Sequence, residues 1–94
     1  MSNTFALKWE QKGDMTMNPA IEKQIGENIK RLRIKSEMTQ EILAAKLQLE
    51  GCDITRSAIA KIEVGQRHLY PDEIILMKKI LNTTYDEIFK LDKS

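Results

Sequence analysis

The segment from Ile54 to Gly65 constrains the fold of this chain most tightly, because its residues determine both ends of one short helix. Thr55 is a residue type that caps helix N-termini, and glycine is common directly after a helix. Ile54 and Ile59 have hydrophobic-staple spacing, which sets how the chain enters the helix. The sequence therefore predicts a helix over residues 55–64.

This helix is predicted to have two unlike faces. Ile59 and Ile62 recur at helical spacing and form a buried side. Arg56, Ser57 and Lys61 lie away from that side, so they are free to face solvent or a ligand. In an arbitrary helix these side chains would form only a solvated face.

Four further helices are predicted in the rest of the chain. Pro19, Thr39, Pro71 and Thr84 each stand where a helix begins, as first-turn prolines or N-caps. Gly26 disfavours an isolated helix, so we expect another helix to cross closely there. The fold class is thus all-α, with a five-helix domain over residues 19–94.

Residues 1–18 are predicted to be a separate N-terminal extension. Phe5, Leu7 and Trp9 alternate with polar residues in it, which is the period of a strand. Two interpretations stay open: a flexible tail, or a short strand that pairs with another copy or with a partner protein.

Composition excludes several kinds of function. The 15 Lys and Arg residues nearly balance the 14 Asp and Glu residues, so any basic surface must come from local arrangement. Cys52 and His68 are the only residues of their types, which argues against a disulfide, a metal site and a catalytic pair. No segment has the length and apolarity of a membrane span. We expect a cytoplasmic protein with no catalytic residues, metal or cofactor.

Three motifs occur in an informative order: "TQE" at 39–41, "IAKIEVG" at 59–65 and "LNTTYDEIF" at 81–89. With them, residues 25–89 resemble the phage-repressor family of helix-turn-helix proteins (lambda repressor and Cro, or XRE-type). The resemblance implies a lambda-repressor-like DNA-binding domain in which the helix over 55–64 lies in the DNA major groove.

The resemblance also assigns roles to residues. It implies base reading by Thr55, Arg56, Ser57 and Lys61, types that match donors, acceptors or the thymine methyl group in the major groove. It implies phosphate contacts by Gln40, Gln66, Arg67 and His68. Val64 departs from the family, which often has a polar residue there, so the resemblance does not imply a phosphate contact at this position. Arg33 and Glu63 are implied to form a structural ion pair.

The implied function is transcriptional regulation, most simply repression, by binding a double-stranded operator. A domain of this size contacts a short half-site, so we expect a homodimer. Candidate dimer surfaces are the extension and the last helix, with Ile88, Phe89 and Leu91. The alternative is an antitoxin-like or regulatory protein-interaction module with the same fold, in which the segment from Phe5 to Trp9 would hold a partner protein. Ile42 is apolar where the second helix of the family usually has a polar residue, so we expect the extension or another subunit to cover it.

The turn before the reading helix is unusually long. Such turns have about three or four residues, whereas several more lie between Leu47 and Ile54, within positions 48–53. Longer loops add little closure entropy. We expect these residues to bulge outward and to place Glu50, Cys52 and Asp53 at the surface.

Overall fold

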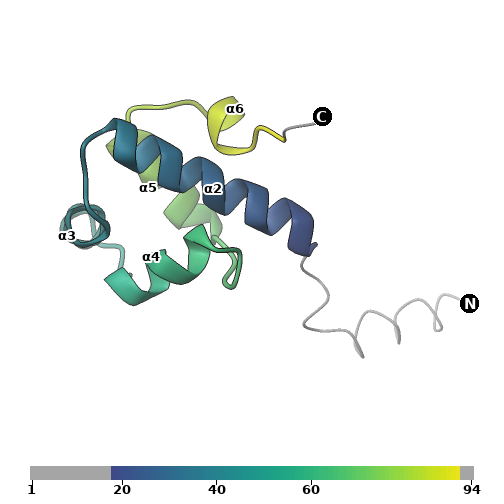
Figure 1. The fold of residues 1–94 in the computed structure, drawn as a ribbon. Helices are drawn as coiled ribbons and strands as arrows, with labels where there is room; N and C mark the ends of the chain where they lie inside the picture. The colour runs from purple at the N-terminus through teal and green to yellow at the C-terminus, as the bar shows by residue number, and fades with distance from the viewer. Residues whose placement is uncertain (1–17, 92–94) are drawn as a thin grey trace, which may run out of the picture.

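The structure is a computed structural model that describes residues 18–91. This part of the chain forms five α-helices and no strand (Figure 1): α2 Pro19–Lys35, α3 Gln40–Leu49, α4 Arg56–Glu63, α5 Pro71–Ile80 and α6 Tyr85–Ile88. The predicted all-α, five-helix fold is confirmed. The predicted extension, with Phe5, Leu7 and Trp9, lies outside the described residues apart from Asn18.

The helices begin where their capping residues predict. The hydroxyl oxygens of Thr39, Thr55 and Thr84 each accept a hydrogen bond from a backbone N–H in the first turn, over 3.0–3.1 Å. Asn18 caps α2 through its Oδ1 atom. Because these bonds satisfy N–H groups that a helix leaves unpaired, local sequence determines the helix starts.

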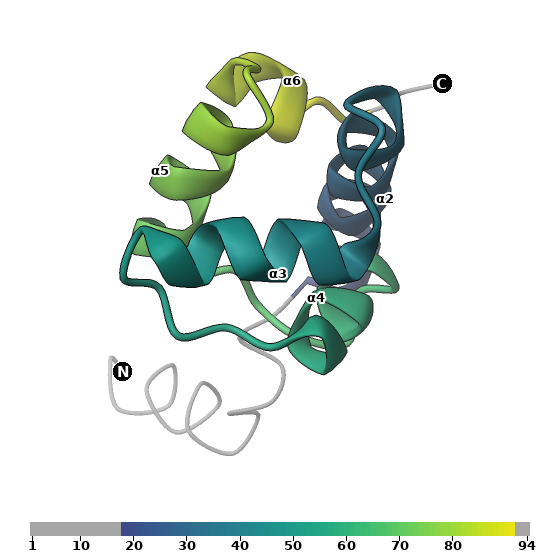
Figure 2. The same cartoon turned by 90° about the vertical axis from the view of Figure 1, so that its left-hand side faces the viewer.

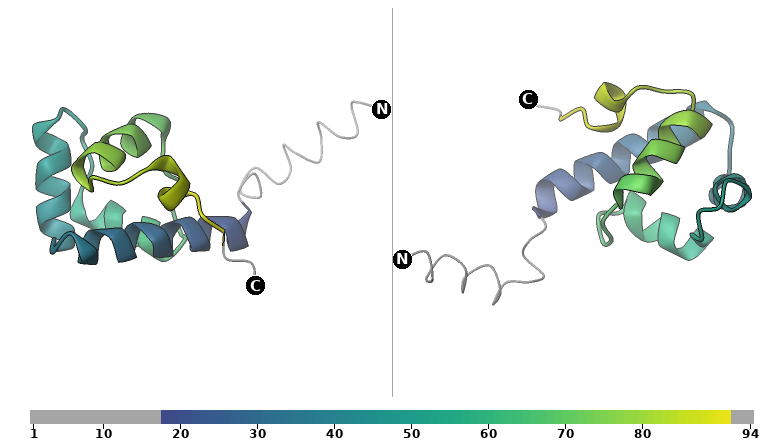
Figure 3. Two further views of the ribbon diagram at one scale, coloured as in Figure 1. Left: turned by 90° about the horizontal axis from the view of Figure 1, so that it is seen from above. Right: turned by 180° about the vertical axis from the view of Figure 1, so that it is seen from behind.

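The helices pack around one core. α2 contacts α4 and α6, and α3 contacts α4 and α5. Figure 2 shows α3 lengthwise across the front of the molecule with α4 beneath it, and Figure 3 shows α6 returning the chain toward α2. Fully buried apolar side chains come from all five helices, among them Ile29, Leu43, Ile59, Met77 and Ile88. Within residues 18–91, no helix is both long and apolar enough to cross a membrane.

The crossing of α2 and α4 is unusually close. A Cβ atom added to Gly26 would overlap the carbonyl oxygen of Ile62 and lie 2.9 Å from that of Glu63. The helix backbones therefore touch at this point, as the glycine within α2 predicts. Any side chain at position 26 would push the helices apart.

The long turn does not bulge outward as expected. It comprises residues 50–55, and Cys52 and Ile54 are buried with 5% and 1% of their surfaces exposed. Gly51 has φ +89°, a left-handed conformation that turns the chain back toward the core. The prediction of a surface Cys52 is wrong, because its apolar thiol fills core space.

Polar contacts hold the rest of the turn. Glu50 and Asp53 are exposed, as predicted. The Gln48 amide donates to the Ile54 carbonyl at 2.7 Å, and Lys79 Nζ donates to Glu50 Oε1 at 3.1 Å. The extra residues thus follow a defined path from α3 to α4, with one contact to α5 through Lys79.

The prediction that Ile88 belongs to a dimer surface on the last helix is also wrong. Ile88 is completely buried, so it belongs to the core and not to an exposed dimer surface. Phe89 and Leu91 are 41% and 50% exposed. Only these two of the three proposed residues remain accessible for such a surface.

Candidate functional site

The exposed side of α4 carries the candidate site. Arg56, Ser57 and Lys61 are exposed along this helix, and so is the capping residue Thr55. α4 lies at the edge of the molecule, at the bottom of Figure 1. The structure thus brings the four residues assigned to base reading onto one accessible helix.

The opposite side of α4 is held by a buried ion pair. Arg33 Nε donates to Glu63 Oε2 at 2.6 Å, and Arg33 Nη2 donates to Glu63 Oε1 at 3.0 Å. Both residues are more than nine-tenths buried. Arg33 Nη1 also donates to the Met38 carbonyl at 2.8 Å. This bidentate pair joins α2 to α4 and to the segment that enters α3.

Gln40 connects the buried pair to the exposed face. Its Nε2 donates to Glu63 Oε1 at 2.9 Å, and its Oε1 accepts from Arg56 Nη1 at 2.9 Å. Glu63 thereby determines which way the Gln40 amide points, and the amide in turn orients Arg56. The sequence placed Gln40 among the phosphate contacts but did not predict its bonds to Glu63 and Arg56. Gln40 and Arg56 are the first residues of α3 and α4. In a helix-turn-helix the starts of these two helices lie close together, and this is the signal from which their hydrogen bond could have been predicted.

The loop between α4 and α5 is fixed largely by Arg67. Its guanidinium donates to both carboxylate oxygens of Glu73, at 2.9 and 3.0 Å, and to the His68 carbonyl at 2.8 Å. It also lies 5.1 Å from the centre of the Tyr70 ring. Hydrogen bonding to Glu73 raises the pKa of Arg67 above its ordinary value. Arg67 therefore stabilises, within the protein itself, the loop whose residues the resemblance assigns to phosphate binding.

The other two residues assigned to phosphate binding lie in the same loop. Gln66 is exposed. His68 Nδ1 lies 3.2 Å from Glu22 Oε2, so its ring is held against the first turn of α2. The loop therefore presents one free amide and two cationic or ionisable side chains that have internal partners.

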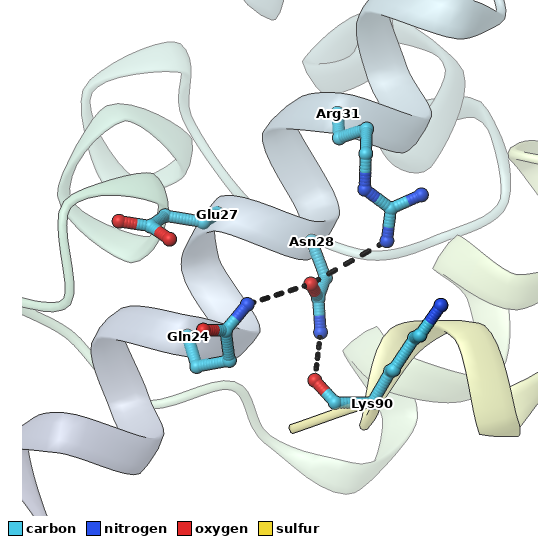
Figure 4. A pocket seen from close by; sticks show the side chains of 5 residues that line it. All are labelled: Gln24, Glu27, Asn28, Arg31 and Lys90. Atoms are coloured by element: carbon cyan, nitrogen blue, oxygen red, sulfur yellow. Dashed lines mark hydrogen bonds between the residues drawn. The ribbon is translucent and has the colours of Figure 1, made fainter. Parts of the chain in front are cut away.

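Asn28 is a buried polar residue that the sequence did not single out. Its Nδ2 donates to the carbonyls of Ile88 and Lys90, at 2.9 and 2.8 Å, and its Oδ1 accepts from Gln24 Nε2 at 3.1 Å. Figure 4 shows the bonds to Lys90 and Gln24. These bonds hold the segment after α6 against α2. Because they satisfy backbone groups, the role of Asn28 is structural.

No catalytic arrangement is evident in the described part of the chain. Burial raises the pKa of the Cys52 thiol, and the carboxylates of Glu73 and Asp72 raise it further. The thiol is therefore a poor nucleophile near neutral pH. Between residues 18 and 91, no three His, Cys, Asp or Glu side chains are grouped so that they could hold a metal ion.

The comparison with protein-family models agrees with this geometry. A family model described as helix-turn-helix matches residues 29–88, which is more than half of the chain. Comparisons with curated proteins and with solved structures found no match. The chain therefore belongs to the XRE-type helix-turn-helix family, the DNA-binding family of lambda repressor and Cro, whose members are generally transcription regulators.

Proposed function

We propose that this member of the helix-turn-helix family is a sequence-specific transcriptional repressor that reads the DNA major groove with the helix over residues 55–64. One observation carries the proposal. Arg56, Ser57 and Lys61 are exposed on a helix whose opposite side is locked by the buried pair of Arg33 and Glu63. Free donors on a fixed helix are what base recognition requires.

The proposed base contacts follow from the side-chain chemistry. Arg56 and Lys61 donate to guanine O6 and N7, and the Ser57 hydroxyl bonds to several base edges. Thr55 keeps its hydroxyl on the Ala58 N–H and can offer its methyl group to thymine. The hydrogen bond that Arg56 donates to Gln40 Oε1 leaves its other guanidinium N–H groups available.

The proposed phosphate contacts flank this helix. One Gln40 amide N–H is not used by Glu63, and it lies at the N-terminus of α3, where backbone N–H groups favour anions. Gln66 is accessible from the loop. Arg67 and His68 are the other two proposed phosphate contacts; in the free protein Arg67 bonds to Glu73, and the His68 ring lies against Glu22.

Repression would follow from occupancy of a promoter. A homodimer on a two-fold symmetric operator supplies two reading helices, with Phe89, Leu91 and residues 1–18 as the proposed dimer surface. We place this activity in the cytoplasm, on nucleoid DNA.

Selection of bound sites from random duplex DNA tests the proposal. We expect enrichment of one consensus that contains guanine in each half-site, related by two-fold symmetry. A consensus without symmetry would contradict the homodimer. Failure to enrich any sequence would overturn sequence-specific binding and favour the antitoxin-like or protein-interaction alternative.

A further inference from the structure

A hollow of about 490 Å³ lies between α2 and α4, beside the first residue of α3. Three charged residues of α2 line one wall, and Ala60 and Glu63 of α4 with its C-cap Val64 line the other. The lining residues are Lys23, Glu27, Lys30, Gln40, Ala60, Glu63 and Val64. None of the proposed base contacts uses this hollow.

We propose that this hollow binds the sugar-phosphate backbone of the DNA that α4 reads, through Lys23 and Lys30, and that Glu27 weakens this contact. The inference rests on the proposed function, because it assumes that α4 lies in the major groove. It adds a third helix, α2, to the DNA interface, which so far comprises α4, the start of α3 and the loop after α4.

The hollow is continuous with the reading face. Residues three apart on a helix are neighbours, so Ala60 lies beside Ser57 and Val64 lies beside Lys61. The major groove is about 12 Å wide, close to the diameter of a helix with its side chains. The flank of a helix in that groove therefore meets the phosphates at the edge of the groove. For α4, the flank that faces α2 is the wall of this hollow.

The charges on α2 suit a phosphodiester. Lys23 and Lys30 are exposed, and none of the ion pairs within residues 18–91 uses either one. The Glu63 carboxylate in the floor is neutralised by Arg33, so its repulsion of an anion is small. Two ammonium groups against the one carboxylate of Glu27 therefore leave the α2 side of the hollow with a net positive charge.

The position of the lysines is set by helix packing. The Cα atom of Lys23 lies only 2.9 Å from where a Cβ atom of Gly65 would stand, so this turn of α2 rests directly on the end of α4. Lys30 lies two turns further along α2, one turn before Arg33. The backbone of both lysines is thus fixed, and only the flexible side chains must order on binding.

Glu27 opposes the lysines. It lies four residues after Lys23 and three before Lys30, so the three share one face of α2. Figure 4 shows its carboxylate pointing away from the hydrogen-bonded group of Gln24, Asn28 and Arg31. An exposed carboxylate beside a phosphate lowers affinity for every DNA sequence equally. It thereby makes binding depend more strongly on the base contacts.

Titration of the full chain with the selected duplex and with an unrelated duplex, over a range of salt concentrations, tests the site. We expect Lys23→Ala/Lys30→Ala to lose about tenfold in affinity for both duplexes and to reduce the salt slope by about two. Glu27→Gln should gain about threefold for both. Lys35→Ala/Lys90→Ala and Asp86→Asn are the matched controls, because they make the same charge changes outside the hollow.

The outcomes separate this site from the reading helix. The site is overturned if the double lysine variant and Glu27→Gln behave like their controls while Arg56→Ala still weakens binding to the selected duplex. If the unmodified chain binds neither duplex, the proposed function fails, and the site fails with it. Should the double lysine variant unfold, Glu27→Gln alone decides, since its gain cannot come from damage to the fold.

Discussion

The two sides of α4 differ in what holds them. On the buried side, Ile59, Ile62 and Glu63 have close partners, and the helix backbone touches that of α2. On the exposed side, Ser57 and Lys61 extend into solvent. One helix of eight residues therefore stabilises the fold with its buried side and is available for DNA contacts with its exposed side. Substitutions on the buried side should change stability, and those on the exposed side should change DNA binding.

The largest effect should come from breaking the buried pair. Arg33→Ala leaves the Glu63 carboxylate buried without its cation, so the free energy of unfolding should fall by about 4 kcal/mol. Urea denaturation measures this. Arg31→Ala is the control, because its pair with Glu87 is exposed and 3.6 Å long, and its loss should change stability by less than about 1 kcal/mol. Normal stability with abolished DNA binding would instead assign Arg33 to the interface.

The helix crossing should give the next largest effect. Gly26→Ala places a methyl group against the α4 backbone, which cannot move aside as a side chain would. We expect a loss of about 3 kcal/mol in the free energy of unfolding. Gly51→Ala meets no atom within 4 Å but has φ +89°, so it should lose only about 1 kcal/mol, from backbone strain. Equal losses would show that the crossing tolerates a side chain.

Thr55 stands at the border between the two sides and should show both effects. Thr55→Ala removes the cap of α4, so stability should fall by about 1 kcal/mol. Thr55→Ser keeps the capping hydroxyl and loses only the methyl group. Thermal unfolding should therefore distinguish Ala from Ser, whereas both should lose any preference for thymine at the contacted base. If Thr55→Ser lost as much stability as Thr55→Ala, the hydroxyl would not be the stabilising cap.

The smallest effect should come from titration of Cys52. The folded-state pKa of this thiol is raised, whereas an unfolded thiol ionises near about pH 8.5. Above that pH the unfolded state releases the proton first, so stability should fall as pH rises toward the folded-state pKa. Denaturation at several alkaline pH values should show a steeper fall for the unmodified chain than for Cys52→Ala. Parallel curves would mean that the thiol ionises equally in both states.

Sequence predicted the features that depend on neighbours along the chain. The caps at Thr39, Thr55 and Thr84 are local, since each hydroxyl bonds to an N–H three residues later. The burial of Cys52 and Ile88 was missed because it depends on which helices enclose them.

Hydrogen bonds between residues far apart in the sequence could not be predicted from the sequence pattern either. Gln40 and Arg56 are 16 residues apart, and the turn between their helices has an unusual length, so spacing alone did not pair them. Asn28 reaches carbonyls 60 and 62 residues away. The base and phosphate contacts remain predictions, because they depend on a DNA molecule as well as on this chain.

The most direct test of the account is the affinity of Arg56→Ala for the selected duplex, measured at fixed salt together with its unfolding temperature. Arg56 has one exposed hydrogen bond in the protein, to Gln40, so the fold should keep its stability. We expect affinity to fall by about 2 kcal/mol, roughly thirtyfold, with relaxed preference at one base pair. Unchanged affinity and unchanged base preference would contradict the claim that the exposed side of α4 reads DNA.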